Sequence, residues 1–233
     1  MSCGIVIALP EELATLTSRK LAKGECIKLS DDILVAYAGA GPNNAANAAR
    51  LLIAKGADRL ISWGCAAALS PQLQSGNLVI ADQLFFDQQV YEADKRWSHK
   101  LRSRLSERLA VTSGNLFTET RIVALSEEKR TIHRDSGAIA LDMESGAIAK
   151  AASQANLPCL VLRAIADPAD MDLPKAVEQA LNSQGEVELP KLLRFLLTHP
   201  WELPALIRLG LHFRAAQKTL KTIAKHLNEI TLF

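Results

Sequence analysis

Short apolar, β-branched runs alternate with helical stretches along most of this 233-residue chain. The runs that have the character of buried strands are residues 3–8, 33–38, 59–63, 78–81, 138–141 and 158–165. The stretches between them that have helical composition are residues 43–55, 98–109, 126–134 and 143–155. Strands and helices that alternate in this way predict an α/β fold with a largely parallel sheet inside.

Polar or small residues follow three of these predicted strands. They form the segments 64–69, 142–145 and 166–170. Ligands of open α/β sheets bind in the crevice at the carboxyl ends of the strands. We therefore expect a functional site where these three segments meet.

The chain changes character from Pro190 onward. Two helices are predicted there, the second running from Pro204 to about Leu227, with apolar residues every seven positions at 206, 213, 220 and 227. A separate basic stripe is formed by Arg214, Lys218, Lys221 and Lys225. We predict one domain over residues 1–189 and a basic amphipathic helical extension over 190–233.

The two parts of the chain also differ in net charge, although the total is small. The net charge is +2, but residues 191–225 carry seven lysines and arginines against one glutamate, a local +6, which leaves −4 on the remainder. So small a total gives no indication of a nucleic-acid partner. The basic, apolar extension is of the kind that binds at membrane surfaces.

Composition and the N-terminus indicate a soluble, cytoplasmic protein. Apolar residues make up 48% and charged residues 22%, which excludes global disorder. The four cysteines are scattered and form no C-x-x-C pair, as expected for reduced thiols. The N-terminus lacks the basic region of a signal peptide, and no uncharged apolar stretch reaches the length that spans a bilayer.

Asp167 follows the apolar run 160–165, and two interpretations of it are open. Partial burial at a strand end raises the pKa of a carboxyl group, so Asp167 could act as an acid near neutral pH. The alternative is a turn-forming aspartate before Pro168.

Two other acidic segments are equally ambiguous. Glu144, in the sequence D-M-E-S at 142–145, either stabilises a helix N-terminus or accepts hydrogen bonds from sugar hydroxyls over an apolar floor formed by Met143. Glu11 and Glu12 follow the first strand and Pro10, where they either begin a helix or supply a base that activates water.

The sequence lacks the motifs of several other kinds of binding and catalytic site. The turn at 39–42 matches a dinucleotide fingerprint only partly, because Asn44 stands where its third glycine belongs and Pro42 is badly placed. Walker, H-E-x-x-H and G-x-S-x-G sequences are absent, and none of the five histidines is an obvious ligand. We expect neither a cofactor nor a metal.

Together and in order, these motifs resemble the nucleoside phosphorylase and nucleosidase superfamily, on its methylthioadenosine/adenosylhomocysteine nucleosidase side. The matching segments are residues 4–12 (first strand and acidic loop), 38–46 (glycine turn and Ala-rich helix), 64–69 (glycine-rich strand end), 141–145 (D-M-E-S ribose motif) and 163–170 (acid loop). The resemblance spans residues 3–172. It implies a three-layer α/β/α fold around a mixed, partly barrel-like sheet, with C-terminal helices, in which residues 1–189 are the catalytic domain.

The resemblance also implies roles for individual residues. Asp167 is the general acid that protonates N7 of adenine, Glu12 activates the attacking water, and Glu144 holds the ribose hydroxyls. Met143 packs against the sugar. The other substrate-binding positions that the resemblance implies are Phe117, which stacks on the base, and Cys65, Ala66 and Ala166.

Within the superfamily the chain is most similar to the hopanoid-associated branch, named a phosphorylase or an adenosylhopane nucleosidase. The segment 164–170, the Leu-Pro step after it and the Leu/Arg-rich tail resemble that branch. This implies removal of adenine from adenosylhopane in hopanoid biosynthesis. The alternatives are a phosphate-dependent purine nucleoside phosphorylase and a non-catalytic protein that binds a nucleoside or a lipid.

The chain departs from the family pattern in ways that bear on its substrate. Ala166 replaces the usual serine before the acid, and Cys65, Ala67 and Ala68 replace a serine and two glycines of G-S-A-G-G-L. These methyl groups narrow the site. The loop after the first strand contains no arginine that could clamp phosphate, so we expect hydrolysis. The resemblance further suggests a homodimer, and a hopane substituent suggests an extension that either contacts a membrane or packs on the protein.

Overall fold

The computed structural model describes residues 2–107, 109–180 and 188–231, so the stretch 181–187 of the predicted catalytic domain lies outside the described residues. Within these ranges the strands are β1 (Cys3–Ile7), β2 (Cys26–Ser30), β3 (Ile33–Tyr37), β4 (Arg59–Ala68), β5 (Leu78–Phe86), β6 (Gln89–Glu92), β7 (Val111–Thr118), β8 (Ala140–Asp142) and β9 (Cys159–Asp167). The helices are α1 (Pro10–Leu13), α2 (Pro42–Ala54), α3 (Lys95–Leu105), α4 (Ser126–Ser136), α5 (Ser145–Gln154), α6 (Lys175–Ala180), α7 (Leu189–Thr198), α8 (Leu203–Ala224) and α9 (Leu227–Thr231), with a 3₁₀ turn, η1, at Pro200–Glu202.

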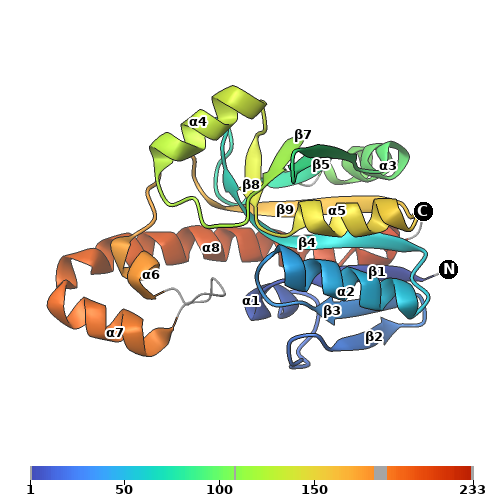
Figure 1. Cartoon of the computed structure of the whole chain (residues 1–233), viewed down its shortest axis with the longest axis horizontal. Helices are drawn as coiled ribbons and strands as arrows, with labels where there is room; N and C mark the ends of the chain where they lie inside the picture. The colour runs from blue at the N-terminus through green and yellow to red at the C-terminus, as the bar shows by residue number, and fades with distance from the viewer. Residues whose placement is uncertain (1, 108, 181–187, 232–233) are drawn as a thin grey trace.

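The strands form one mixed sheet that partly closes on itself (Figure 1). The order is β2-β3-β1-β4-β8-β7-β5-β6, and β9 pairs with both β4 and β5. The strands β4, β9, β5, β7 and β8 therefore form a closed ring, while β1, β2 and β3 extend it as an open sheet. The prediction of a mixed, partly barrel-like sheet is confirmed. Among the described residues five of the nine strand pairings are parallel, as the alternation of strands and helices predicts for most of the sheet, and four are antiparallel.

Side chains of the central strands alternate between two cores, which makes the fold three-layered. In β1, Val6 packs with α2 and α5 on one face, whereas Ile5 and Ile7 pack with α3 and α8 on the other. A strand points successive side chains to opposite faces, so a strand that is apolar at every position needs a helical layer on each side. This is why β1, β4 and β9 are almost fully buried.

The structure adds strands that the sequence did not predict. β2 and β6 lie at the edges of the sheet and β7 is half-buried, so their sequences lack the continuous apolar run of a central strand. α3 begins at Lys95, three residues before the predicted Ser98, because the side chain of Asp94 accepts a hydrogen bond from the backbone N–H of Trp97 at 2.8 Å and so caps the helix.

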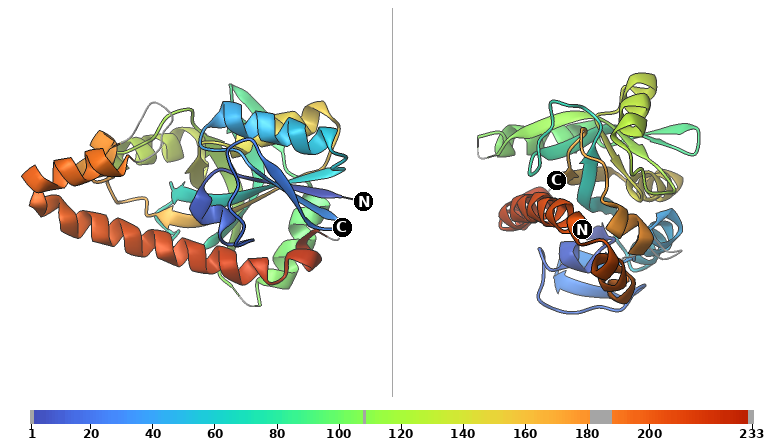
Figure 2. Two further views of the ribbon diagram at one scale, coloured as in Figure 1. Left: turned by 90° about the horizontal axis from the view of Figure 1, so that it is seen from below. Right: turned by 90° about the vertical axis from the view of Figure 1, so that its left-hand side faces the viewer.

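The C-terminal helices α7 and α8 form a hairpin that projects from the body and then returns to it (Figure 2). In the second half of α8, Ala216, Leu220 and Ile223 are buried against β9 and its neighbours. The first half of α8 and all of α7 have no buried residue. Among the described residues, no helix combines the length and the apolar character needed to cross a membrane.

Candidate active site

A cavity of about 280 Å³ opens where β4, β8 and β9 end. Seven of the eight site residues predicted from the sequence line it: Glu12, Cys65, Ala66, Met143, Glu144, Ala166 and Asp167. The expected convergence at the strand ends is therefore present. Asp142 and Asp167 are the last residues of β8 and β9, while Cys65 and Ala66 lie in the final part of β4, which is longer than predicted.

Glu12 is held rigidly by backbone N–H groups. Its side chain comes from α1, which Pro10 begins, and it is only 3% exposed. Oε2 accepts hydrogen bonds from the backbone of Ala8 at 3.2 Å and Leu9 at 3.0 Å, and Oε1 accepts one from Cys65 at 2.7 Å. Burial raises the pKa of Glu12, and the nearby Arg163 partly opposes this. A carboxylate so fixed is oriented before any ligand arrives.

Arg163 is a buried cation beneath the cavity that the sequence prediction missed. Its Nε donates to Asp142 Oδ2 at 2.7 Å and its Nη2 donates to Ser62 Oγ at 2.8 Å. Glu12 and Arg163 both crowd the backbone at Gly64, where a Cβ atom would lie closer than 3.0 Å to each of them. Gly64 is therefore required by the close approach of these two side chains.

Asp142 of the D-M-E-S motif joins several elements beside the cavity through hydrogen bonds. Oδ1 accepts a hydrogen bond from Thr118 Oγ1 at 2.7 Å, and Oδ2 accepts from both the backbone and the hydroxyl of Ser145 as well as from Arg163. These contacts connect β7, β8, β9 and the start of α5. The residues of the motif therefore have two roles: Asp142 fixes the turn, and the turn places Met143 and Glu144 at the cavity.

Glu144 is 9% exposed and sits at the N-terminal end of α5. Its Oε1 accepts a hydrogen bond from the backbone N–H of Gly41 at 2.9 Å. Burial, followed by the charge of Asp142, raises the pKa of Glu144 to about 7, with Arg163 acting in the opposite direction. The glycine turn at 39–42, which does not fit a dinucleotide site, instead orients this carboxyl group.

Asp167 is held by one oxygen only. Lys129, a fully buried residue of α4, donates from Nζ to Asp167 Oδ2 at 2.6 Å and to the carbonyls of Pro168 and Met171 at 3.0 and 2.8 Å. The other oxygen, Oδ1, is buried and has no hydrogen-bond partner among the described residues. Burial raises the pKa of Asp167, partly offset by Lys129. A carboxyl group with one anchored and one unpaired oxygen is suited to bond a ligand.

The sequence prediction missed Lys129 and the segment 121–123, which lines the cavity. Lys129 lies in the charged sequence S-E-E-K-R, which predicts an exposed helix, and only packing of α4 over the end of β9 buries it. Arg163 carried a better signal, because it is a charged residue inside the otherwise apolar run of β9.

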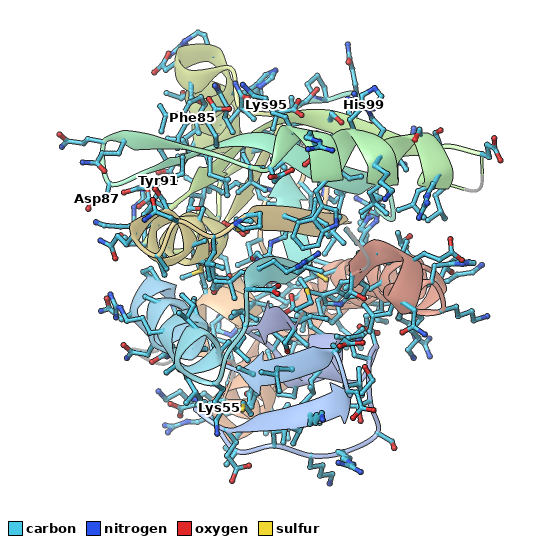
Figure 3. The ribbon with its side chains drawn as sticks, turned by 90° about the vertical axis from the view of Figure 1, so that its right-hand side faces the viewer. Lys55, Phe85, Asp87, Tyr91, Lys95 and His99 are labelled. Carbon is cyan, nitrogen blue, oxygen red and sulfur yellow. The ribbon has the colours of Figure 1, made fainter. Side chains whose placement is uncertain are left out.

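Phe117 is the predicted site residue that does not line this cavity, and its base-stacking role stays a prediction. It lines a second pocket with Phe86, Thr118 and Lys150. Lys150 donates to Asp87 Oδ2 at 2.7 Å. Asp87 lies at the turn of the β5–β6 hairpin, on the side of the molecule shown in Figure 3.

Comparison with known proteins identifies the family. The profile of the phosphorylase superfamily matches residues 2–194, which is most of the chain. The chain belongs to the phosphorylase superfamily. A 5′-methylthioadenosine/S-adenosylhomocysteine nucleosidase from Mycobacterium bovis is 24% identical over an alignment covering 74% of this chain and 88% of that protein.

Solved structures of the superfamily share the fold. A nucleosidase of the same name from Neisseria meningitidis, in complex with methylthio-immucillin-A, has a TM-score of 0.72 at 21% identity, covering 98% of this chain and 99% of that one. A futalosine hydrolase from Helicobacter pylori has a TM-score of 0.70 at 20% identity, covering 98% and 96%.

Membership in the superfamily confirms three predictions. The family and the three-layer fold are those expected, and the chain is an enzyme that cleaves the N-glycosidic bond of nucleosides. The acidic cavity at the strand ends is where such a ligand belongs in this fold.

Proposed function

We propose that this enzyme hydrolyses an adenine nucleoside and releases adenine. The observation that supports this most directly is the convergence of Glu12, Glu144 and Asp167 on one cavity from separate strand ends. Cleavage of an N-glycosidic bond passes through a cationic, oxocarbenium-like sugar, as in glycoside hydrolysis. Carboxylates around the sugar stabilise that charge, and a protonated carboxyl group assists the leaving base.

Each carboxyl group has one step in the proposed reaction. Asp167 gives its proton to N7 of adenine while the bond from C1′ to N9 breaks and its electron pair moves into the base. Glu12 takes a proton from the water whose oxygen bonds to C1′. Glu144 accepts hydrogen bonds from the ribose hydroxyls and Met143 packs against the sugar. The products are adenine, which keeps the proton from Asp167, and the free ribosyl compound, which keeps the hydroxyl group of the water. The proton that Glu12 took from the water then passes through solvent to Asp167, which restores both carboxyl groups.

The electrostatics of the site suit these roles. Burial raises the pKa of Asp167, so its proton is retained closer to neutral pH than in a free aspartate. The anchor from Lys129 to Oδ2 leaves Oδ1 as the atom that faces a ligand. Cys65 and Ala66 of β4 and Ala166 of β9 supply the small apolar walls that separate the acid from Glu12.

Hydrolysis fits the site better than phosphorolysis because the cations near the cavity are already paired with carboxylates. Arg163 pairs with Asp142, Lys129 with Asp167, and Arg121 with Glu128. An anion clamp needs cations whose hydrogen-bonding groups face the ligand. A phosphate-dependent phosphorylase is the alternative that the experiment below distinguishes.

We further propose that the natural substrate is lipid-linked, namely adenosylhopane in hopanoid biosynthesis. Cys65, Ala67, Ala68 and Ala166 stand where the family has serines and glycines, and these changes support a substrate other than methylthioadenosine. The proposal includes a cytoplasmic homodimer whose residues 1–189 form the catalytic domain. Its residues 190–233 reach the inner face of the membrane, where such a substrate resides.

Adenine release measured with and without inorganic phosphate tests the proposal. We expect equal rates in both buffers, and faster release from adenosylhopane than from methylthioadenosine. A strict requirement for phosphate would show a phosphorylase, and no release from either nucleoside would contradict an adenine nucleoside as the substrate. Faster turnover of methylthioadenosine would contradict the lipid-linked substrate while leaving the hydrolysis intact.

A further inference from the structure

The α7–α8 hairpin exposes an unusual number of large apolar side chains. Of the nine that are at least half exposed among the described residues, seven fall between positions 189 and 211: Leu189, Leu193, Leu197, Trp201, Leu203, Ile207 and Leu211. The other two, Val90 and Leu125, are isolated in the sequence. Contiguous exposed apolar patches are rare on soluble proteins and mark interaction surfaces.

These side chains form two stripes. On α7 they recur every four residues, at Leu189, Leu193 and Leu197, and on α8 at Leu203, Ile207 and Leu211. Residues four apart lie on one face of a helix. Trp201 sits in the bend between the two helices, in η1. The hairpin, drawn in orange at the left of Figure 1, thus carries apolar side chains along its full length.

The same face of α8 changes from apolar to basic along the helix. After Leu211, the exposed residues at spacings of three or four are Arg214, Lys218, Lys221 and Lys225. Seven positions from 203 to 225 therefore line one face, apolar in its first half and basic in its second. The opposite face of the second half, with Leu220 and Ile223, is buried in the core and fixes the helix in this orientation.

We propose that this face docks on a bilayer with anionic headgroups. The hairpin apolar stripe (Leu189 to Leu211) would lie at the boundary of the acyl chains, and the basic stripe (Arg214 to Lys225) would contact the headgroups. Amphipathic helices bind membranes by burying apolar side chains at this depth, and each lysine or arginine near an anionic surface adds attraction. The inference rests on the proposed function for the choice of a lipid-linked substrate and names the surface that would meet it.

The charge of the face favours a bilayer over a second copy of this chain. Pairing two copies across it would bring one basic stripe against the other, or against the leucines of the partner. Residues 191–225 carry a local charge of +6, which an anionic surface neutralises and the same face of a second copy does not.

Two hydrogen bonds join the hairpin to segments next to residues that line the active-site cavity. Leu173 lines the cavity and leads into α6, whose Ala176 N–H donates to Glu202 Oε2 at 3.4 Å. Gln217 of α8 donates from Nε2 to the carbonyl of Glu11, the neighbour of Glu12, at 3.4 Å. Docking through the hairpin therefore brings the cavity side of the molecule toward the bilayer.

Vesicle flotation of the full-length protein tests this surface. The probes are vesicles of phosphatidylcholine alone and of phosphatidylcholine with phosphatidylglycerol. We expect the protein to float with the anionic vesicles, with binding reduced about tenfold or more by the double change Leu193→Gln and Ile207→Gln. Lys218→Glu should reduce binding about fivefold or more.

A matched control uses the other basic helix. Lys100 is an exposed lysine on α3, next in sequence to His99, which Figure 3 labels; α3 lies at the right of Figure 1, and α7 at the left. Lys100→Glu makes the same charge change as Lys218→Glu and should leave flotation unchanged. Adenine release from water-soluble methylthioadenosine should be unchanged in all three variants, because none of the altered residues lines the cavity.

Three results would overturn the inference: no flotation with anionic vesicles, an equal loss with Lys100→Glu, or a double variant that floats like the unaltered protein. If light scattering shows that the double variant separates a dimer while its flotation is unchanged, the face is a subunit interface. Flotation without adenine release from any nucleoside would contradict the proposed function and leave the surface intact.

Discussion

The active-site cavity and the α7–α8 hairpin depart from the usual distribution of side chains in opposite directions. At the cavity, Glu12, Lys129 and Arg163 are charged and almost completely buried. On the hairpin, leucines and a tryptophan are half exposed or more. Charged groups rarely enter a protein interior unless they are paired, and large apolar groups rarely gather on its surface.

The two regions differ in whether contacts within the chain stabilise their unusual side chains. Each buried charge at the cavity is held by hydrogen bonds from several elements, so the surrounding fold stabilises an arrangement that is unfavourable by itself. The exposed stripe on the hairpin has no such support from the described part of the chain. The charges of the first region are therefore paired within the described chain, whereas the apolar stripe of the second is covered only by the partner that we propose.

Asp167→Asn should have the largest effect. An amide cannot deliver the proton to the leaving base, so adenine release should fall by about 10²–10⁴-fold. Steady-state adenine release measures this, with binding of a nucleoside analogue as a check that the cavity is intact. Asp170→Asn, at an exposed carboxyl group three residues further along, is the matched control and should keep full activity. Full activity in Asp167→Asn would remove the acid from the mechanism.

The same substitution in the two halves of α8 separates the buried from the exposed part of that helix. Leu220 is fully buried and Leu211 is 59% exposed. Leu220→Ala should lower the free energy of unfolding by about 2–5 kcal/mol through loss of burial and a cavity. Leu211→Ala should change it by less than about 0.5 kcal/mol. Urea denaturation compares the two, and equal losses would show that the hairpin packs on the protein in solution.

Gly64→Ala tests how tightly the buried charges are packed. The added methyl group must displace Glu12 or Arg163, so adenine release should fall by roughly 10²-fold, as for a catalytic group moved by about 1 Å. Gly210→Ala is the control, because Gly210 lies in α8 with open space around it. There the change should stabilise the helix by about 1 kcal/mol and leave activity unaltered. Unchanged activity in Gly64→Ala would mean that the two side chains do not act on the substrate.

Lys129→Met should shift the pH dependence. Asp167 acts while protonated, so activity is present below its pKa and is lost as the pH rises through it. Burial raises this pKa and Lys129 lowers it, so removal of Lys129 should move the alkaline limb of the rate profile to higher pH. The maximal rate should also fall because Oδ2 loses its anchor.

Arg130→Met is the control for this shift, since Arg130 is the exposed neighbour of Lys129 on α4. Its pH–rate profile should coincide with that of the unaltered enzyme. An alkaline limb that stays in place in Lys129→Met would mean that a group other than Asp167 supplies the proton.

Much of the site could be predicted because its residues follow apolar runs. Asp142 and Asp167 are the last residues of the buried strands β8 and β9, and the sequence alone shows where the apolar runs of these strands end. Arg163 could have been recognised by the same reasoning, as a charge within a buried run. Lys129 could not, because its burial depends on α4 packing against the end of β9 and not on any feature of its own helix.

The sequence by itself determined the α/β layers, the acidic strand ends and the separation of charge between the first 190 residues and the tail. Local patterns decide these features, because burial on both faces requires an apolar residue at every position of a strand. Tertiary structure decided which charges meet. It also decided which side of α8 is covered. Leu220 of the predicted heptad stripe is buried, while Leu203, Ile207 and Leu211, outside that stripe, are exposed. Periodicity identifies residues that share a helix face, but only the packing of distant segments decides which face the protein covers.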